Sequence, residues 1–260
     1  MTTRELALEL KVSDWKARDI LKSNGIRKLS SRFVPRFLTA EMCQRRLQSC
    51  EENLRLHEEH GRTFLENMVT VDETPLSLYC PESKRESSEW CFPNESAPRK
   101  LRSSTSHGRC SMLTVFWDSQ GPIKLDFADK SVKINSEYYA DLVKETRKLR
   151  RKPKGSPLWL LQDNAPIHTS QLTMRAIQGS NFHLVDHPPY SPDLAPSDFW
   201  LFRHLKKELR GHHFDSSDCV RHAVENFFRT RTSDFYSSAF AELLSRWKKC
   251  VDNNGSYVEK

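Results

Sequence analysis

The sequence predicts an α/β protein, in which a mixed sheet flanked by helices follows a small helix-turn-helix segment. Short apolar runs such as 158–161 alternate with amphipathic stretches of helix length. The first 30 residues instead contain two stretches with helical spacing, joined by a short turn. A chain of 260 residues can hold one domain with a substantial core and a small accessory domain. We therefore expect a helix-turn-helix segment at 1–30, a linker and bridging helix at 31–66, and the larger domain at 67–260.

Composition favours an intracellular protein. Hydrophobic residues make up 37% of the chain, and no apolar run is long enough to span a bilayer. The N-terminus lacks the apolar stretch of a signal peptide, and we expect no membrane partner. The seven cysteines are odd in number, scattered and never in C-x-x-C pairs, which argues against a disulfide framework and a structural zinc site. We expect reduced thiols.

The positive charge is concentrated in two short regions. Net charge is +7, with nine Lys and Arg against four Asp and Glu in residues 1–40, and seven against one in residues 144–154. Local basic surfaces are typical of proteins that face phosphates. For the run from Arg147 to Lys154, three interpretations are equally open: a solvated loop, a DNA contact or a nuclear import signal.

The N-terminal segment has the pattern of two helices joined by a short turn. Arg4 to Leu10 carries apolar residues at helical spacing, and Ser13 is placed to cap a second helix that stops at Asn24-Gly25. Many packed helix pairs share this pattern. In a helix-turn-helix, however, the second helix enters the major groove of double-stranded DNA. The candidate DNA contacts are Lys16, Arg18, Lys22, Arg27 and Lys28.

After a charged helical stretch at 41–66, which we expect to bridge to the larger domain, the sequence predicts three antiparallel strands. Met68 to Val71 is a short apolar strand, with 76–79 as its hairpin partner. The polar stretch 81–107 is expected to be a loop or arm. Strands at 110–117 and 123–127 follow, with a turn between them.

The second half alternates helices and strands. A helix at 136–150 leads to the strand at 158–161, which should pair in parallel by the crossover rule. Further expected elements are a helix at 170–178, a strand at 183–186, a stiff extended loop at 187–192, and helices at 199–209, 215–230 and 233–251. This order is that of an RNase H-like fold.

Three aspartates stand at the ends of these elements. Asp72 and Asp163 follow strands, Asp198 opens a helix, and 34 residues separate the second from the third. Any one of them alone is more often turn or cap chemistry. Brought together, however, like charges resist ionisation unless a cation compensates them. Oxygen ligands suit Mg²⁺ or Mn²⁺, and two such ions about 4 Å apart can promote phosphodiester cleavage.

The motifs VTVDET, LLQDNAPIHTS and HPPYSPDLAPSDFWLF together resemble the catalytic core of mariner-type DNA transposases. The resemblance extends from Arg4 to the C-terminal helices and implies that the catalytic and metal-binding triad falls on Asp72, Asp163 and Asp198. Asp193 would then belong to the proline-rich loop. Glu73, on the opposite side of the strand, would be a supporting residue, and we expect neither His168 nor His187 to be catalytic.

The resemblance also implies an activity and partners. These are cleavage of DNA at terminal inverted repeats, transfer of the 3′-hydroxyl to target DNA, a nuclear location, and a homodimer formed through the linker and the loop 187–196. Two departures stand out: Phe33 and Arg36 occupy linker positions that the family fills with Trp and His, and only one helix-turn-helix fits before Phe33 where the family has two. The alternative is a truncated or domesticated DNA-binding protein without transposition activity.

Overall fold

The computed structural model describes residues 2–28, 34–81, 109–150 and 157–258. The chain forms two compact units, Met1–Arg36 and Phe37–Lys260. Within the described residues, no helix is long and apolar enough to cross a membrane. Residues 82–107 of the expected arm, the part of the basic run after Arg150, and Phe33 of the linker fall outside them.

The smaller unit contains two helices, α1 (Thr3–Glu9) and α2 (Asp14–Ser23). The hydroxyl of Ser13 accepts a hydrogen bond from the backbone N–H of Lys16 at 3.2 Å, which confirms Ser13 as the N-cap of α2. Ala17 is buried against α1. The five basic residues named above are all exposed, as contacts with DNA require.

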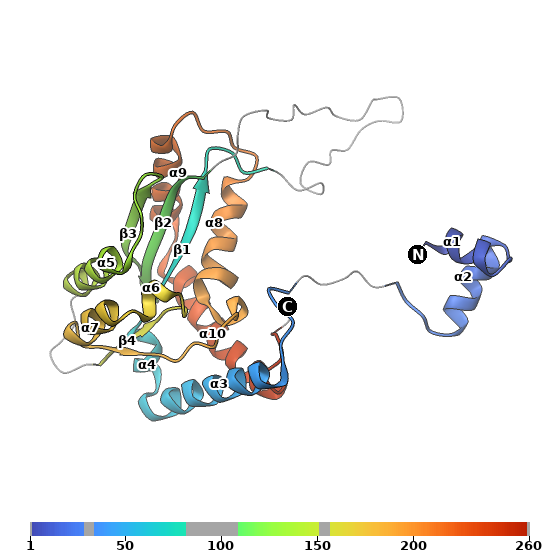
Figure 1. The fold of residues 1–260 in the computed structure, drawn as a ribbon, viewed down its shortest axis with the longest axis horizontal. Coiled ribbons are helices and arrows are strands. Elements are labelled where there is room, and N and C mark those ends of the chain that lie inside the picture. The colour runs from blue at the N-terminus through green and yellow to red at the C-terminus, as the bar shows by residue number, and fades with distance from the viewer. Residues whose placement is uncertain (1, 29–33, 82–108, 151–156, 259–260) are drawn as a thin grey trace. The chain divides into compact units, whose positions relative to one another are not determined.

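The larger unit is built on a five-stranded mixed sheet with the order β3-β2-β1-β4-β5 (Figure 1). Its strands are β1 (Met68–Ser77), β2 (Arg109–Asp118), β3 (Gly121–Asp129), β4 (Leu158–Leu161) and β5 (Phe182–Leu184). β1, β2 and β3 are antiparallel, whereas β4 runs parallel to β1 and β5 parallel to β4. The predicted meander followed by a parallel crossover is confirmed.

Strand β1 is longer than the sequence predicts. We expected it to end at Val71 and to be followed by a hairpin partner, but Asp72 pairs with Val115 and Leu76 with Ser111 in one continuous strand. β4 pairs with β1 only as far as Thr70. Beyond that point one edge of β1 is free of β4, and Pro75, which has no N–H to donate, is accommodated there. Asp72 therefore lies within a strand and not at its end.

The helices differ from prediction mainly at their boundaries. They are α3 (Ala40–His60), α4 (Arg62–Glu66), α5 (Ser136–Leu149), α6 (Pro166–Thr169), α7 (Gln171–Gly179), α8 (Phe202–Leu209), α9 (Ser217–Thr230) and α10 (Ser233–Asp252). The bridging helix breaks at Gly61, which has a φ of +62°. The proline-rich loop is not wholly extended, because Pro192–Leu194 forms a turn of 3-10 helix.

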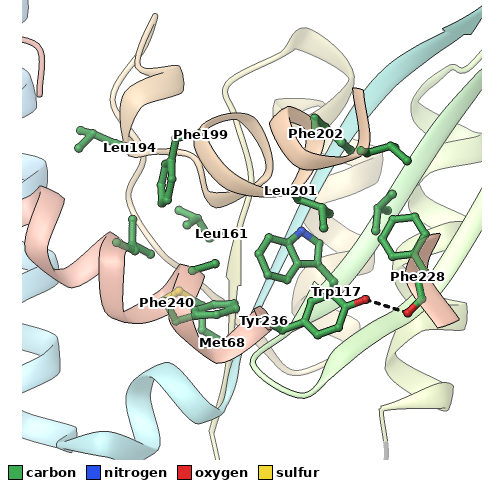
Figure 2. Packing of buried hydrophobic residues seen from close by; sticks show 14 of the residues in the cluster. Met68, Trp117, Leu161, Leu194, Phe199, Leu201, Phe202, Phe228, Tyr236 and Phe240 are labelled. Carbon is green, nitrogen blue, oxygen red and sulfur yellow. Dashed lines mark hydrogen bonds between the residues drawn. The ribbon is translucent and has the colours of Figure 1, made fainter. Parts of the chain in front are cut away.

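Alternating side chains of the sheet pack into two separate hydrophobic clusters, one on each face. Met68, Trp117 and Leu161 face a cluster with side chains from α3, α8, α9 and α10, including Phe240 (Figure 2). Val69, Val71 and Leu160 face the opposite side, against α5 and α7. Because successive strand residues point to opposite faces, each residue's position along β1 or β4 decides which face it serves. The six described cysteines are all free thiols.

Candidate active site

The parallel register of β1 and β4 places Asp72 beside Asp163. Thr70 is paired with Leu161, and each aspartate follows two residues later along its own segment. Within β1, a step of two residues keeps the side chain of Asp72 on the same face as that of Thr70. Asp163 lies two residues past the end of β4, and its charge raises the pKa of Asp72, so the two carboxylates lie near each other at one end of the sheet.

Asp198 reaches the same face from a helix. It lies in η2 (Ser197–Leu201), a wide helical turn that continues into α8 and contacts β1. The buried hydroxyl of Ser197 accepts a hydrogen bond from the indole Nε1 of Trp117 at 3.0 Å. This contact fixes the start of the helix against β2, and with it the position of Asp198.

The acidic groups perturb one another. Burial raises the pKa of Asp72 well above its usual range, and the charges of Asp198, Glu73 and Asp163 raise it further. The pKa of Asp198 rises to about 6 because the surrounding protein displaces water from its carboxylate; Lys206 opposes this rise and Asp163 adds to it. Among the described residues, none lies within ion-pair distance of Asp72 or Asp198. Asp72 and Asp198 therefore carry like charges that no described cation pairs with directly.

Asp163 differs from the other two aspartates because it has donors of its own. Its Oδ1 accepts a hydrogen bond from the backbone N–H of Ala165 at 2.9 Å and lies 2.5 Å from Nδ1 of His168. Burial would raise the pKa of Asp163, but the hydrogen bonds from His168 and Ala165 outweigh it and lower that pKa. Burial likewise opposes protonation of His168, yet the carboxylates of Asp163 and Glu73 raise its pKa to about 9.

The donor set fits a hard divalent cation. Three carboxylates from separate elements influence one another's pKa, and two of them have raised pKa values that a bound cation would lower. Within the described part of the chain, no three His, Cys, Asp or Glu side chains already have the geometry of a metal site.

A groove runs past Asp163 and Asp198. The proline-rich loop forms one wall of it, and its lining residues are Asp163, Asn164, Ala165, His187, Pro188, Pro189, Tyr190, Ser191, Pro192, Ala195 and Asp198. The groove is open to solvent at both exposed aspartates, so an extended polymer could lie across the acidic cluster.

The comparisons with known proteins agree with this geometry. Residues 67–221 match the family model described as DDE superfamily endonuclease. The mariner Mos1 transposase of Drosophila mauritiana is 31% identical over 264 residues, which span 99% of this chain and 75% of that protein. The chain belongs to the mariner-type transposases of the DDE superfamily.

Other relatives extend the comparison. A human protein named histone-lysine N-methyltransferase SETMAR is 36% identical over 264 residues, although the chain spans only 38% of its length. Crystal structures of the Mos1 mariner paired end complex, one with Mn and one with Mg, superpose with a TM-score of 0.86 at 29% identity. Each match covers 100% of this chain and 76% of the Mos1 chain. The mixed sheet flanked by helices is thus the RNase H-like fold of the mariner catalytic domain.

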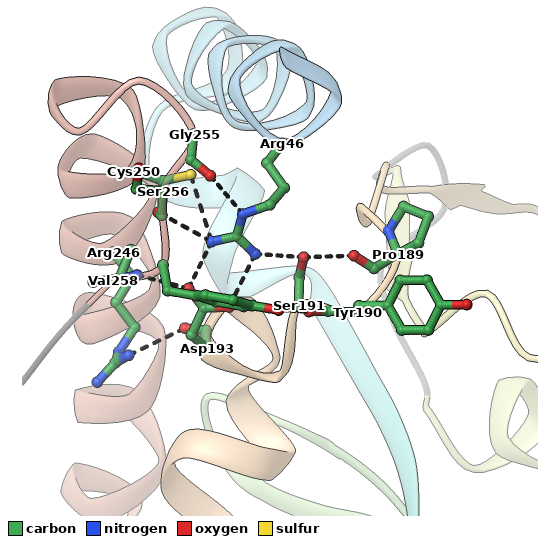
Figure 3. Close-up of polar contacts among 11 residues, drawn as sticks. Arg46, Pro189, Tyr190, Ser191, Asp193, Arg246, Cys250, Gly255, Ser256 and Val258 are labelled. Atoms are coloured by element: carbon green, nitrogen blue, oxygen red, sulfur yellow. Dashed lines mark hydrogen bonds and ion pairs between the residues drawn. The ribbon is translucent and has the colours of Figure 1, made fainter. Parts of the chain in front are cut away.

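In this mariner-type chain, Asp193 has a structural partner. Both its carboxylate oxygens bind the guanidinium of Arg46, at 3.0 and 2.7 Å, and Oδ2 also accepts the N–H of Val258 at 2.8 Å (Figure 3). Arg46 is 1% exposed and also donates to Ser191 and to the Gly255 carbonyl. These contacts anchor the groove wall to α3 and to the C-terminal segment.

The sequence did not single out Arg46. It follows Arg45 in a helix whose charged residues all resemble a solvated surface, and only the fold shows which of the two arginines is buried. The two histidines near the triad do differ in role. His187 is buried, which lowers its pKa to about 4. His168 contacts both Asp163 and Glu73.

Proposed function

We propose that this protein is a divalent-metal-dependent DNA transposase, which cleaves DNA at transposon inverted repeats and transfers the freed 3′-hydroxyl to target DNA. The observation that carries the proposal is the convergence of Asp72, Asp163 and Asp198 at one end of the sheet, with no described cation within ion-pair distance of Asp72 or Asp198. Mos1 structures that bind a transposon end, Mn or Mg support the assignment by similarity.

Different residues of the chain would hold the metal ions and position the DNA strand. Asp72 and Asp163, side by side on β1 and after β4, would hold both of two Mg²⁺ or Mn²⁺ ions, and Asp198 would complete the second position. Such a pair supplies charge stabilisation at the attacking and leaving oxygens of a phosphodiester. The groove wall from His187 to Ala195 would keep the DNA strand in line with the carboxylates, since rigid positioning supplies much of the rate.

Other parts of the chain would supply recognition and assembly. The exposed residues Lys16, Arg18, Lys22, Arg27 and Lys28 would contact the phosphates and bases of the inverted repeat. Two of them are partly neutralised within α2, by ion pairs from Lys16 to Asp19 and from Arg18 to Asp14. We further propose a homodimer that uses the linker and the loop 187–196, and a nuclear location where such DNA is found.

The test is cleavage of terminal-repeat DNA by the full chain. Asp163→Asn should abolish Mg²⁺- or Mn²⁺-dependent strand cleavage, because the amide cannot supply a charged ligand oxygen. Asp141→Asn, which changes a carboxylate on α5 that pairs with Lys144 at 2.8 Å, should leave cleavage intact. Retained nicking by Asp163→Asn would refute the assignment. A wild-type protein that binds this DNA but never cleaves it would support the alternative of a DNA-binding protein without transposition activity.

A further inference from the structure

His168 lies between two carboxylates and is completely buried. Its Nδ1 lies 2.5 Å from Oδ1 of Asp163, and its Nε2 lies 3.3 Å from Oε1 of Glu73. Its side chain is 0% exposed. Glu73 follows Asp72 in β1 and so points to the opposite face of the sheet, towards α5. The imidazole therefore connects the acidic cluster to a carboxylate behind it.

The orientation of the His168 ring is set by groups other than Asp163. The ring packs on Tyr139 of α5, with centroids 4.2 Å apart. The backbone carbonyl of His168 accepts a hydrogen bond from Nε2 of Gln162 at 3.2 Å, and Oε1 of Gln162 accepts one from the Tyr139 hydroxyl at 2.8 Å. This buried network, together with Glu73, fixes the direction of Nδ1 before any cation binds.

Both hydrogen bonds to Asp163 reach the same oxygen. His168 and the backbone of Ala165 approach Oδ1, and no described residue donates a hydrogen bond to Oδ2. We propose that His168 is a positioning residue, which holds Oδ1 of Asp163 and thereby leaves Oδ2 directed to the divalent cation. Glu73 keeps the ring in place from behind.

This inference rests on the proposed function, because it assumes that Asp163 binds a cation. Removal of a group that orients a metal ligand typically lowers the affinity for the metal about 10–100-fold. Without Nδ1, the Ala165 N–H is the one donor to the Asp163 carboxylate left among the described residues, and the carboxylate can rotate, since its side chain is 50% exposed. Affinity for the cation should fall accordingly, even if no DNA is present.

The experiment is a titration of the metal-free full chain with Mn²⁺, followed by electron paramagnetic resonance of the free ion and by the shift in unfolding temperature. His168→Leu should weaken Mn²⁺ binding about 10–100-fold. His168→Asn should bind Mn²⁺ nearly as the wild type does, because its amide nitrogen can donate from the position of Nδ1. The matched control is His222→Asn, which changes an exposed histidine on α9 that pairs with Glu225.

Two comparisons decide the outcome. If His168→Leu folds and binds Mn²⁺ as tightly as the wild type, the positioning role is overturned. If His168→Leu does not fold, His168→Gln replaces it, because its amide reaches the position of Nε2 and not of Nδ1. Weaker binding by His168→Gln than by His168→Asn supports the proposal, and equal binding overturns it.

The same Mn²⁺ titration distinguishes failure of the positioning role from failure of the proposed function. A wild-type chain that takes up no Mn²⁺, or an Asp163→Asn variant that binds it as the wild type does, would overturn the proposed function and this inference together. Binding that is lost in Asp163→Asn but unchanged in the His168 variants would overturn the positioning role alone.

Discussion

Replacement of Arg46 by methionine should be among the most destabilising single changes in the larger unit. The guanidinium is 1% exposed and pairs with both oxygens of Asp193, and it also donates to Ser191 and Gly255. Methionine fills similar space but leaves the carboxylate of Asp193 with one donor, the N–H of Val258. Removal of one partner from a buried ion pair costs about 3–5 kcal/mol, because the remaining charge is left without compensation.

The neighbouring arginine provides the matched control. Arg45 pairs with Asp186 at 3.0 Å, but the two side chains are 56% and 38% exposed. Exposed ion pairs contribute about 0–1 kcal/mol. Arg45→Met should therefore change the free energy of unfolding by no more than about 1 kcal/mol, although the substitution is chemically identical and lies one residue away.

The assay is urea denaturation of the metal-free chain, followed by tryptophan fluorescence, with the denaturant slope compared between variants. If the loss of stability arises from the unpaired charge of Asp193, the double variant Arg46→Met with Asp193→Asn should regain part of the lost free energy of unfolding. A free energy of unfolding for Arg46→Met that lies within 1 kcal/mol of Arg45→Met would refute the reasoning from burial.

Two other predictions concern backbone space and pH. Gly255 has a φ of +78°, and a Cβ there would overlap the backbone carbonyl of Cys43, so Gly255→Ala should cost at least about 1–3 kcal/mol. Gly179→Ala, which meets nothing within 4 Å, should change stability by less than about 0.5 kcal/mol, and equal values for the two would contradict the account. The pKa of Asp198 rises from 3.8 to about 6 on folding. Between about pH 4 and pH 6, the folded, metal-free protein therefore keeps a proton on Asp198 that the unfolded chain has released. The stabilisation that this group contributes is present below about pH 4 and is lost as pH rises through 6. The stability of Asp198→Asn relative to wild type should therefore increase between pH 4 and pH 7. A difference in urea midpoints that stays constant over this range would exclude this assignment.

Much of the sheet was predictable because its strands are short and apolar and end at clear turn residues. The order of three antiparallel strands and a parallel crossover was predicted correctly. The length of β1 was not predictable, because Pro75 resembles a strand-breaking residue in the sequence. The strand continues through Pro75 because β4 pairs with β1 only as far as Thr70, so no hydrogen bond to β4 is needed at Pro75. Gly61, which divides the bridging helix, has a positive φ that nothing in the neighbouring sequence indicates.

The acidic residues of the site were predictable as a set, because all three matched family motifs, although Asp72 lies within β1 and not at the strand end that the sequence indicates. The residues that support them were not. Arg46 meets Asp193 across 147 positions of sequence, and His168 meets Glu73 across 95. Pairings at such separations depend on how the sheet and helices pack, which periodicity and turn chemistry do not encode.

The shared register of β1 and β4 limits how the chain can vary in length. Loss or gain of one residue between Thr70 and Asp72 would turn the Asp72 carboxylate to the α5 side of the sheet. The site would then be lost without any substitution of its acids. Among relatives, insertions and deletions should therefore collect in the connections between elements and avoid this short interval.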